Sequence, residues 1–274
     1  MKVSIIIAVY KDIEALSLIL KSLEKQSYTN FEVIIAEDNN DSRMVSFIST
    51  VKSLEIKHTY QKDNGVQKSK SQNNAIKIAA GDYLIFIDGD CILYKDFIRN
   101  HVLLSSQKLI ISGRRVNLGP KYSTLLRKES LSSCELENIF VKKYFDIAKD
   151  AKSEKHTEQG FLIKPFGLIH KILDYRKKEL SLLGCNFSCY KDAMFEINGF
   201  DEGLGNSAFA GDTDIEWRFK GKGYKTRSSK YITNQFHLYH KRKIEDYERG
   251  ITKDMENNQK NNIFKCKKGL INFS

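Results

Sequence analysis

The sequence has few prolines and no long apolar run. Only two of its 274 residues are proline, and no apolar stretch approaches the roughly 18–20 residues that a helix needs to span a bilayer. The apolar run at residues 3–10 is too short, and is followed too soon by polar residues, to be a signal peptide. We therefore expect a cytoplasmic protein that reaches a membrane only peripherally, on its inner face.

The cysteines are too few and too scattered for a disulfide framework or a zinc site. There are five, an odd number, and Cys185 and Cys189 lack a second pair at zinc-binding spacing. Ordinary reduced thiols are the simplest interpretation. The apolar content is not low. Hydrophobic residues make up 41% of the chain, which excludes a disordered chain and allows a substantial core.

The protein does not have an excess of acidic residues, because its formal net charge is +11. Such proteins bind nucleic acid, anionic membranes or phosphorylated ligands, or simply carry a solvated basic surface. No nucleic-acid-binding motif is present, so we expect no nucleic-acid partner. The basic residues cluster at Arg114-Arg115 and in the tail 241–274, among other places. We expect the tail to contact an anionic membrane.

Short apolar runs alternate with helix-period stretches over residues 1–113. This alternation is typical of βαβ units, so we predict an α/β fold with a mainly parallel sheet flanked by helices. Strands are predicted at 3–10, 31–36, 56–60, 83–87, 109–112 and 184–190. Residues 114–181 are interpreted as a variable insertion with helical patches at 123–148 and 166–178. Residues 182–240 complete a single domain, and 241–274 form a basic C-terminal tail.

Polar residues follow three of the predicted strands at their carboxyl ends, where α/β sheets bind ligands. Tyr10 ends the first strand, Asp38 follows the second, and Asp88-Gly89-Asp90 follows the fourth. Two carboxylates separated by a glycine can converge on a hard divalent ion such as Mg²⁺ or Mn²⁺. A plain turn is the alternative interpretation of this tripeptide.

These motifs together resemble family 2 glycosyltransferases of the GT-A fold. The later motifs are similar to the C-terminal part of galactosyl- and N-acetylgalactosaminyltransferases, including the chondroitin-polymerase type. The matching segments are 4–11 with Glu14, then 33–38, 81–91, 184–188, 198–202 and 211–218. The resemblance covers 1–113 and 182–240 and leaves the insertion unmatched.

The resemblance implies a UDP-sugar donor, with Asp38 accepting a hydrogen bond from the uracil imide. An arginine that often precedes Asn73 in the family is replaced by Gln72, so Lys68 or Lys70 is expected to take over its contact with the diphosphate. The other implied nucleotide-binding residues are Ala8, Tyr10, Glu14, Lys70, Asn73, Asp88 and Gly89.

The resemblance also implies a Mn²⁺ or Mg²⁺ ion bound by Asp90, with Asp88 near the ribose or the metal. A family segment that supplies a histidine ligand matches His237 and His240. Three residues apart on a strand, these side chains would point to opposite faces, so we expect only one to be a ligand and favour His237. A hydrogen-bonded structural histidine is the alternative for each.

Asp212 matches the family's general base, which takes a proton from the acceptor hydroxyl. A helix predicted to begin at residue 212 leaves a purely structural N-cap as the alternative. The acceptor or sugar is expected to contact Asn186, Phe209, Gly211 and Asp214. Asp214 has an alternative role in stabilising the helix N-terminus. Gly211 stands where the family commonly has glutamate.

The resemblance thus implies an inverting transferase that moves a hexose or N-acetylhexosamine from a UDP-sugar to a saccharide or lipid-linked glycan acceptor, in surface polysaccharide biosynthesis. A nucleotidyltransferase is an alternative, but it has no use for the Asp212 and His237 segments. A degenerate module that binds UDP-sugar without turnover is another, supported by the departures at Gln72 and Gly211.

Overall fold

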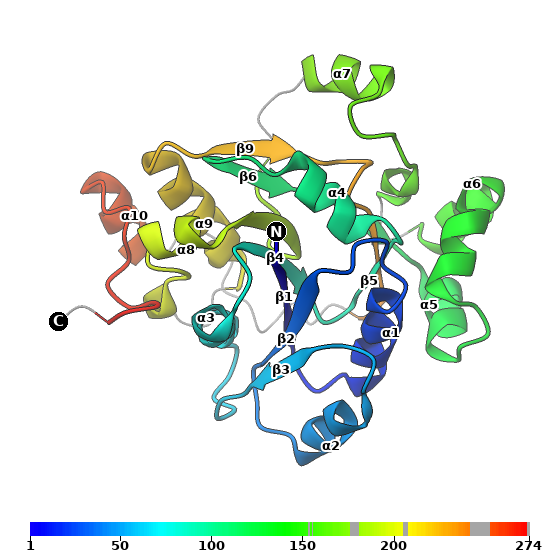
Figure 1. The fold of residues 1–274 in the computed structure, drawn as a ribbon, viewed down its shortest axis with the longest axis horizontal. Coiled ribbons are helices and arrows are strands. Elements are labelled where there is room, and N and C mark those ends of the chain that lie inside the picture. The colour runs from blue at the N-terminus through cyan, green and yellow to red at the C-terminus, as the bar shows by residue number, and fades with distance from the viewer. Residues whose placement is uncertain (153, 155, 176–180, 205–207, 242–252, 273–274) are drawn as a thin grey trace.

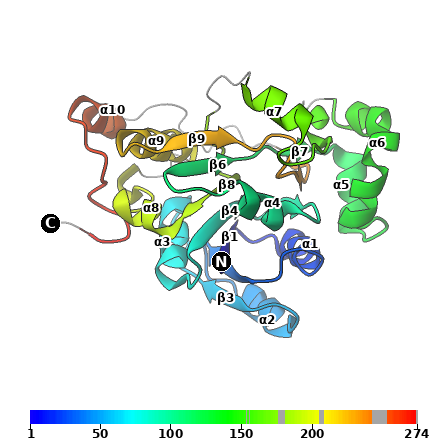
Figure 2. The same cartoon turned by 45° about the horizontal axis from the view of Figure 1, so that its top comes forward.

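A seven-stranded sheet forms the centre of the computed structural model, which describes residues 1–152, 154, 156–175, 181–204, 208–241 and 253–272. The strand order is β3-β2-β1-β4-β8-β6-β9, which Figure 2 shows across the molecule. Only β8 runs antiparallel to its neighbours, β4 and β6. The predicted mainly parallel sheet is therefore confirmed. The strands are β1 (Val3–Val9), β2 (Phe31–Glu37), β3 (Ile56–Thr59), β4 (Tyr83–Asp88), β6 (Leu109–Ser112), β8 (Asn186–Tyr190) and β9 (Lys225–Ser228).

Helices cover both faces of this sheet (Figure 1). They are α1 (Ile13–Leu23), α2 (Ser42–Thr50), α3 (Lys68–Ile78), α4 (Phe97–Leu104), α5 (Pro120–Arg127), α6 (Ser133–Asp150), α7 (Leu168–Tyr175), α8 (Lys191–Glu196), α9 (Ala208–Gly221) and α10 (Lys253–Lys260), with 3-10 turns η1 (Thr157–Gly160) and η2 (Glu202–Leu204). Because side chains alternate along a strand, Ile5 and Ile7 of β1 join the core beneath α1, α4, α5 and α6, whereas Ile6 joins the core beneath α3, α8 and α9.

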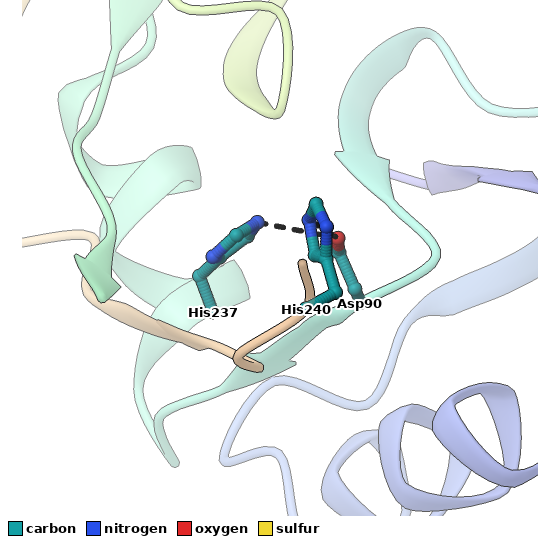
Figure 3. Close-up of side chains that lie close together, drawn as sticks. All are labelled: Asp90, His237 and His240. Atoms are coloured by element: carbon teal, nitrogen blue, oxygen red, sulfur yellow. Dashed lines mark ion pairs between the residues drawn. The ribbon is translucent and has the colours of Figure 1, made fainter. Parts of the chain in front are cut away.

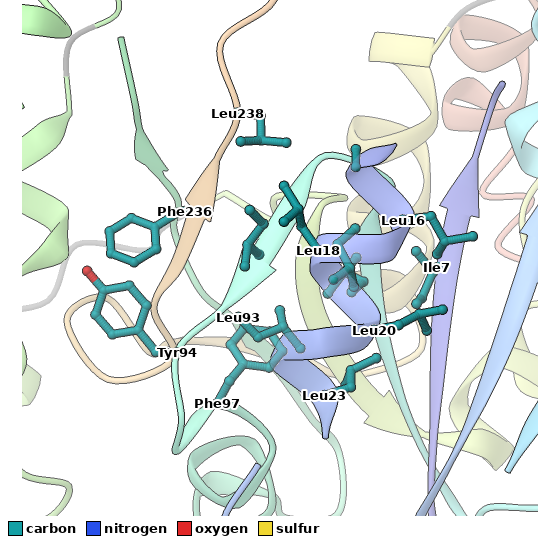
Figure 4. Close-up of a cluster of buried hydrophobic side chains, with 14 of the residues drawn as sticks. Ile7, Leu16, Leu18, Leu20, Leu23, Leu93, Tyr94, Phe97, Phe236 and Leu238 are labelled. Atoms are coloured by element: carbon teal, nitrogen blue, oxygen red, sulfur yellow. The ribbon is translucent and has the colours of Figure 1, made fainter. Parts of the chain in front are cut away.

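A small second sheet fixes the later part of the chain against the first half. Its strands are β5 (Cys91–Leu93), β10 (Gln235–His237) and β7 (Val116–Asn117), with β10 in the middle. Figure 4 shows Phe236 of β10 beside Tyr94, next to Leu93 and the leucines of α1. The Phe236 and Tyr94 ring centroids lie 4.5 Å apart, and burying such a ring stabilises the fold by about 1.5–3 kcal/mol. This packing holds β10, and hence His237, in place.

The described part of the tail is packed onto the domain. Met255 of α10 is buried with Leu204, and the ring of Phe264 lies 4.9 Å from that of Trp217, centroid to centroid. Leu270 is buried in the core beneath α3 and α8. Residues 242–252, which carry part of the tail's basic charge, lie outside the described residues. Within the described ranges, every helix falls short of the length and apolarity needed to cross a bilayer.

Candidate active site

The ends of β1, β2 and β4 lie side by side, as the sequence predicts. Ala8 pairs with Ala36 of β2 on one side and with Asp88 of β4 on the other. Gly89 lets the turn after β4 approach β1 closely, because a Cβ there would lie 2.8 Å from the Ala8 carbonyl oxygen. Residues following the three strands therefore share one edge of the sheet.

Asp90, His237 and His240 form a cluster at this edge (Figure 3). The Nε2 atom of His237 lies 3.2 Å from Asp90 Oδ2, and that of His240 lies 3.3 Å from the same oxygen. Strand pairing brings them together, since His237 lies opposite Cys91 in the antiparallel β5–β10 pair. The two imidazoles do not point to opposite faces as expected, because β10 ends at His237 and the chain then turns His240 back towards Asp90. Whether one or both bind a metal stays a prediction.

The cluster fits a divalent ion such as Mn²⁺ or Mg²⁺. One ligand atom from each residue lies within 4.8 Å of the other two, and adjacent ligands of an octahedral ion bonded at about 2.1 Å lie about 3 Å apart. Burial alone would raise the pKa of the Asp90 carboxyl, but the two imidazoles hold it well below its usual range. A carboxylate that stays ionised beside imidazole nitrogens is a donor set that such ions accept.

Asp88 does not join this cluster among the described residues, and instead forms an ion pair with Lys68 of α3. Burial lowers the pKa of Lys68, but the carboxylates of Asp88 and Asp212 raise it above its usual value overall. Lys68 is thus a half-buried cation facing both acids, whereas Lys70 is exposed. The charge of Lys70 acts on Asp38. Of the two candidates for the diphosphate contact, Lys68 has the better position.

Asp212 lies inside α9, not at its start, so the N-cap interpretation is wrong: the helix begins at Ala208. Its Oδ2 accepts a hydrogen bond of 2.8 Å from the backbone N–H of Gly184, just before β8. A Cβ on residue 184 would lie 2.0 Å from Asp212 Oδ1, so only glycine leaves room for this carboxylate. Burial raises the pKa of Asp212, although Lys68 and the Gly184 N–H favour its ionised form. A poised acid of this kind suits proton transfer.

Asp38 lies beside an open cavity of about 580 Å³, whose wall includes Asn39, Tyr60 and Gln61. Its two carboxylate oxygens accept hydrogen bonds of 2.7 Å, one from Gln61 Nε2 and one from the backbone N–H of Gln67. Burial raises the pKa of Asp38 despite these bonds. Each carboxylate oxygen has a second lone pair, so the group can still accept a bond from a ligand.

Tyr10 stands beside the same cavity and is half-exposed. Its hydroxyl lies 3.3 Å from Asp63 Oδ2, and Lys11 also pairs with Asp63, at 2.7 Å. Lys11 and Asp63 both line the cavity. Tyr10 and Asp38 do not themselves line this cavity, but each is bonded to a residue that does, Tyr10 to Asp63 and Asp38 to Gln61.

Four predicted contact residues have other partners in the structure. Asn73 is fully buried and bonds to Phe200 and Glu202, and Asn186 is fully buried and bonds to His101 and to two backbone carbonyls. Asp214 forms a buried ion pair with Arg218, and Glu14 pairs with Arg127 of α5. The polar groups of Asn73, Asn186 and Asp214 are thus buried and bonded within the protein, whereas Glu14 is exposed. Their expected contacts with ligands stay predictions.

The two remaining acceptor-side predictions lie at the start of α9. Gly211 faces open space, because a Cβ built there meets no atom within 4 Å. A side chain such as the glutamate common in the family would therefore fit. The side chain of Phe209 lies outside the described residues.

Arg115 is a site residue that sequence reasoning missed. Its guanidinium contacts Cys185 Sγ at 3.8 Å. Burial lowers the pKa of Arg115, but Cys185, Asp88 and Asp90 are among the groups that raise it overall. The only signal in the sequence was the Arg114-Arg115 pair, which lies in the unmatched insertion. Arg115 directly precedes β7, and β7 pairs with β10, the strand that ends at His237. This pairing brings Arg115 to the site.

Comparison with known proteins identifies the family. The model of glycosyl transferase family 2 matches residues 4–166, more than half of the chain. The chain belongs to glycosyltransferase family 2. This match covers β1 to β7 and ends before Asp212 and the two histidines.

Curated relatives of this family 2 glycosyltransferase carry transferase names. The uncharacterized glycosyltransferase YfnE of Bacillus subtilis is 25% identical over 92% of this chain and 69% of its own length. The glucosyltransferase WfaP of Escherichia coli is 31% identical over 40% of this chain and 44% of its own. RC0461 of Rickettsia conorii is 34% identical, but the chain spans only 16% of that protein.

Solved structures share the fold of this family 2 glycosyltransferase. Residues 1–349 of TarS from Staphylococcus aureus, in complex with UDP-GlcNAc, superpose with a TM-score of 0.58 at 14% identity, over 94% of this chain and 64% of that one. The mannosyltransferase PcManGT from Pyrobaculum calidifontis, in complex with GDP-Man and Mn²⁺, gives 0.56 at 13% identity, over 88% and 58%. These likenesses show a GT-A fold.

Proposed function

We propose that this family 2 glycosyltransferase moves a hexose or N-acetylhexosamine from a UDP-sugar to a saccharide or lipid-linked glycan acceptor, with inversion, in surface polysaccharide biosynthesis. The observation that carries the proposal is the meeting of a carboxylate–imidazole cluster (Asp90, His237, His240) with Asp212 and Lys68 at one edge of the sheet. A metal site, a cation for phosphate and a candidate base are the parts that a nucleotide-sugar transfer needs.

The donor would lie across the strand ends, with its base in the cavity beside Tyr10 and Asp38. Its diphosphate would reach Lys68 and Arg115, the two half-buried cations whose charges act on the site acids. Mn²⁺ or Mg²⁺ on Asp90 and the histidines would neutralise the charge that develops on the leaving diphosphate. We take Mn²⁺ as the first candidate, because the solved structure of PcManGT is a complex with that ion.

Asp212 would take the proton from the acceptor hydroxyl as that oxygen attacks the sugar. Its bond to the Gly184 N–H fixes the carboxylate while leaving lone pairs for the acceptor. Direct displacement inverts the anomeric centre, so an α-linked UDP-sugar would give a β-linkage. The similarity of segments 184–188 and 211–218 to chondroitin-polymerase-type transferases supports this assignment and is part of the proposal.

Two alternatives are less well supported. A nucleotidyltransferase has no use for a carboxylate held opposite Gly184. A binding module without turnover would not need a half-buried acid with a raised pKa beside the phosphate cations. The sequence supports the binding module through Gly211, which stands where the family commonly has glutamate. The structure makes this support weaker, because residue 211 faces open space and the missing side chain disturbs no packing.

Release of the nucleoside diphosphate, UDP or GDP, from a panel of nucleotide sugars tests the proposal. UDP-glucose, UDP-galactose, their N-acetylated forms and GDP-mannose are incubated with the protein in Mn²⁺ or in EDTA. We expect one UDP-sugar to be turned over, and only with metal. Preference for GDP-mannose would contradict the donor assignment, and full activity in EDTA would contradict the metal role. Binding of UDP without turnover, across a panel of saccharide acceptors, would favour the binding module.

Lys68 and Lys70 form a matched pair for testing the diphosphate contact. Replacing Lys68 by methionine is expected to raise the Kd for UDP by about 10- to 100-fold, the value of a hydrogen bond to a charged group. Lys70→Met should change it by less than about threefold, because Lys70 is exposed. Calorimetric titration with UDP and with uridine measures both. The assignment would be contradicted if both variants lost UDP affinity equally. It would also be contradicted if Lys68→Met weakened uridine binding as much as UDP binding.

A further inference from the structure

The helix α7 turns its apolar side to solvent. Leu168, Ile169, Ile172 and Leu173 are 76%, 61%, 47% and 37% exposed, although they occupy one continuous arc of the helix. The buried side chain of its first turn is His170, at 4%. A helix that packs on its own domain places these residues the other way round. Figure 1 shows α7 standing at the outer edge of the molecule, beyond β9.

This orientation is set by the segment before the helix. The backbone N–H of Phe166 donates a 2.9 Å hydrogen bond to His170 Nδ1, and the two rings lie 5.8 Å apart, centroid to centroid. The N–H of Lys171 bonds to the carbonyl of Gly167 at 3.0 Å. These contacts fix the first turn on the segment before it, and that segment is bound to the body of the protein where the Ile163 N–H donates a 2.8 Å bond to the Tyr231 carbonyl.

Exposed apolar side chains also lie on the segment before the helix. Leu162 and Phe166 are 53% and 48% exposed, and both line a hollow of about 320 Å³ between the segment before α7 and helix α4. Leu103 of α4, 45% exposed, lines the same hollow. Exposed apolar residues gathered on neighbouring segments of the chain are typical of an interaction site.

The segment that contains α7 is basic in sequence. Residues 164–179 carry five basic and two acidic residues, of which those at 176–179 lie outside the described residues. Lys164 and Lys171 are exposed beside the apolar arc. An apolar arc flanked by lysine and arginine is the pattern of a helix that lies in the interface of an anionic bilayer. A second copy of the chain is a poor occupant, because a symmetric contact would bring these lysines together.

We propose that α7 is an interfacial helix that docks the protein on an anionic membrane, with Leu168, Ile169, Ile172 and Leu173 inserted among the lipids. The contact differs from the one expected of the tail 241–274, part of which is packed on the domain. It does not depend on the proposed sugar transfer, since binding to lipid needs no donor. It would hold the protein where lipid-linked saccharides are found.

Flotation with vesicles tests this, using the whole chain without nucleotide. Vesicles of phosphatidylcholine with 30% phosphatidylglycerol are compared with pure phosphatidylcholine. We expect wild type to bind the anionic vesicles and Leu168→Asn/Ile172→Asn to lower the partition coefficient by at least about tenfold, because two large apolar side chains are lost. Val45→Asn/Ile78→Asn, which changes two exposed apolar residues on α2 and α3, is the matched control and should stay within about twofold.

Charge is tested separately with Lys164→Glu/Lys171→Glu. This variant should lose about tenfold or more in binding to anionic vesicles, since each lysine near the surface contributes about 1 kcal/mol, and should bind neutral vesicles as wild type does. Unchanged melting temperatures would show that all variants fold. The proposal is overturned if Leu168→Asn/Ile172→Asn binds like wild type, or if wild type binds neither vesicle. It is also overturned if wild type self-associates in sedimentation and that variant does not.

Discussion

Replacing Asp212 by asparagine is expected to lower kcat by about 10²- to 10⁴-fold, the contribution of a positioned general base. Asparagine has the same shape and can still accept the hydrogen bond from the Gly184 N–H, so donor affinity should stay within about twofold. Steady-state kinetics together with UDP titration separate the two quantities. A loss of donor binding equal to the loss of kcat would assign Asp212 a structural role instead.

Glu216 supplies a matched control on the same helix. It lies one turn after Asp212, and its Oε2 accepts a 3.1 Å bond from the backbone N–H of Leu182, just as Asp212 accepts one from Gly184. Glu216→Gln should therefore reproduce the loss of a carboxylate on α9 without loss of the base. We expect its kcat to stay within about threefold of wild type.

The pH profile gives the same assignment independently. Because burial raises the pKa of Asp212, the base becomes protonated at a higher pH than an ordinary aspartate, and kcat/KM should fall as the pH drops through that raised value. Above it the base is ionised and the rate should be level. The residual activity of Asp212→Asn should lack this acidic limb.

Replacing Asp90 by alanine is expected to lower metal-dependent turnover by about 10³-fold or more, because a bound divalent ion contributes several kcal/mol to a transition state that gains charge. The structure adds a sharper expectation: His237→Ala and His240→Ala should each weaken Mn²⁺ binding by about tenfold or more, since both imidazoles face Asp90. Electron paramagnetic resonance of Mn²⁺ measures the affinities. If His240→Ala bound Mn²⁺ with wild-type affinity, only His237 would be left as a histidine ligand of the metal.

Asp82→Ala is the control for this series. Asp82 is exposed and lies immediately before β4, at the opposite end of the strand from Asp88. Its replacement removes the same charge from the same strand without touching the site. Mn²⁺ affinity and turnover should both remain within about twofold of wild type.

The strands that lie in the centre of the sheet could be predicted closely from the sequence. β1, β2 and β4 are buried on both faces and are mainly apolar, with Ser4 and Glu32 as polar residues within β1 and β2. This leaves little freedom in where the strands end. Their polar ends follow directly, and with them the positions of Asp38, Asp88 and Asp90. The direction of β8 could not be predicted, since an apolar run does not say whether it pairs parallel or antiparallel.

Helix starts and side-chain directions were the weaker part. The helix predicted to begin at residue 212 in fact includes Gly211, because one glycine costs a helix only about 1 kcal/mol, and α9 runs through it from Ala208. Asn73 and Asn186 lie in segments that resemble the family, yet a resemblance cannot separate a residue that contacts a ligand from one that supports the wall. The solvent exposure of the apolar arc of α7 could not be predicted for a related reason. An amphipathic pattern predicts that a helix has an apolar face, but not whether that face is covered by the protein.

The close contact between Gly184 and Asp212 also constrains how such sequences change over time. Any side chain at residue 184 would collide with the carboxylate, so as long as Asp212 is under selection the glycine is held with it. A lineage that loses the acid loses the reason for the glycine, and the two positions should then drift together. Although they lie on either side of β8 and α8 in the chain, they form one inherited unit. A relative that retains only one of Gly184 and Asp212 would be a candidate for an enzyme that has lost its catalytic activity.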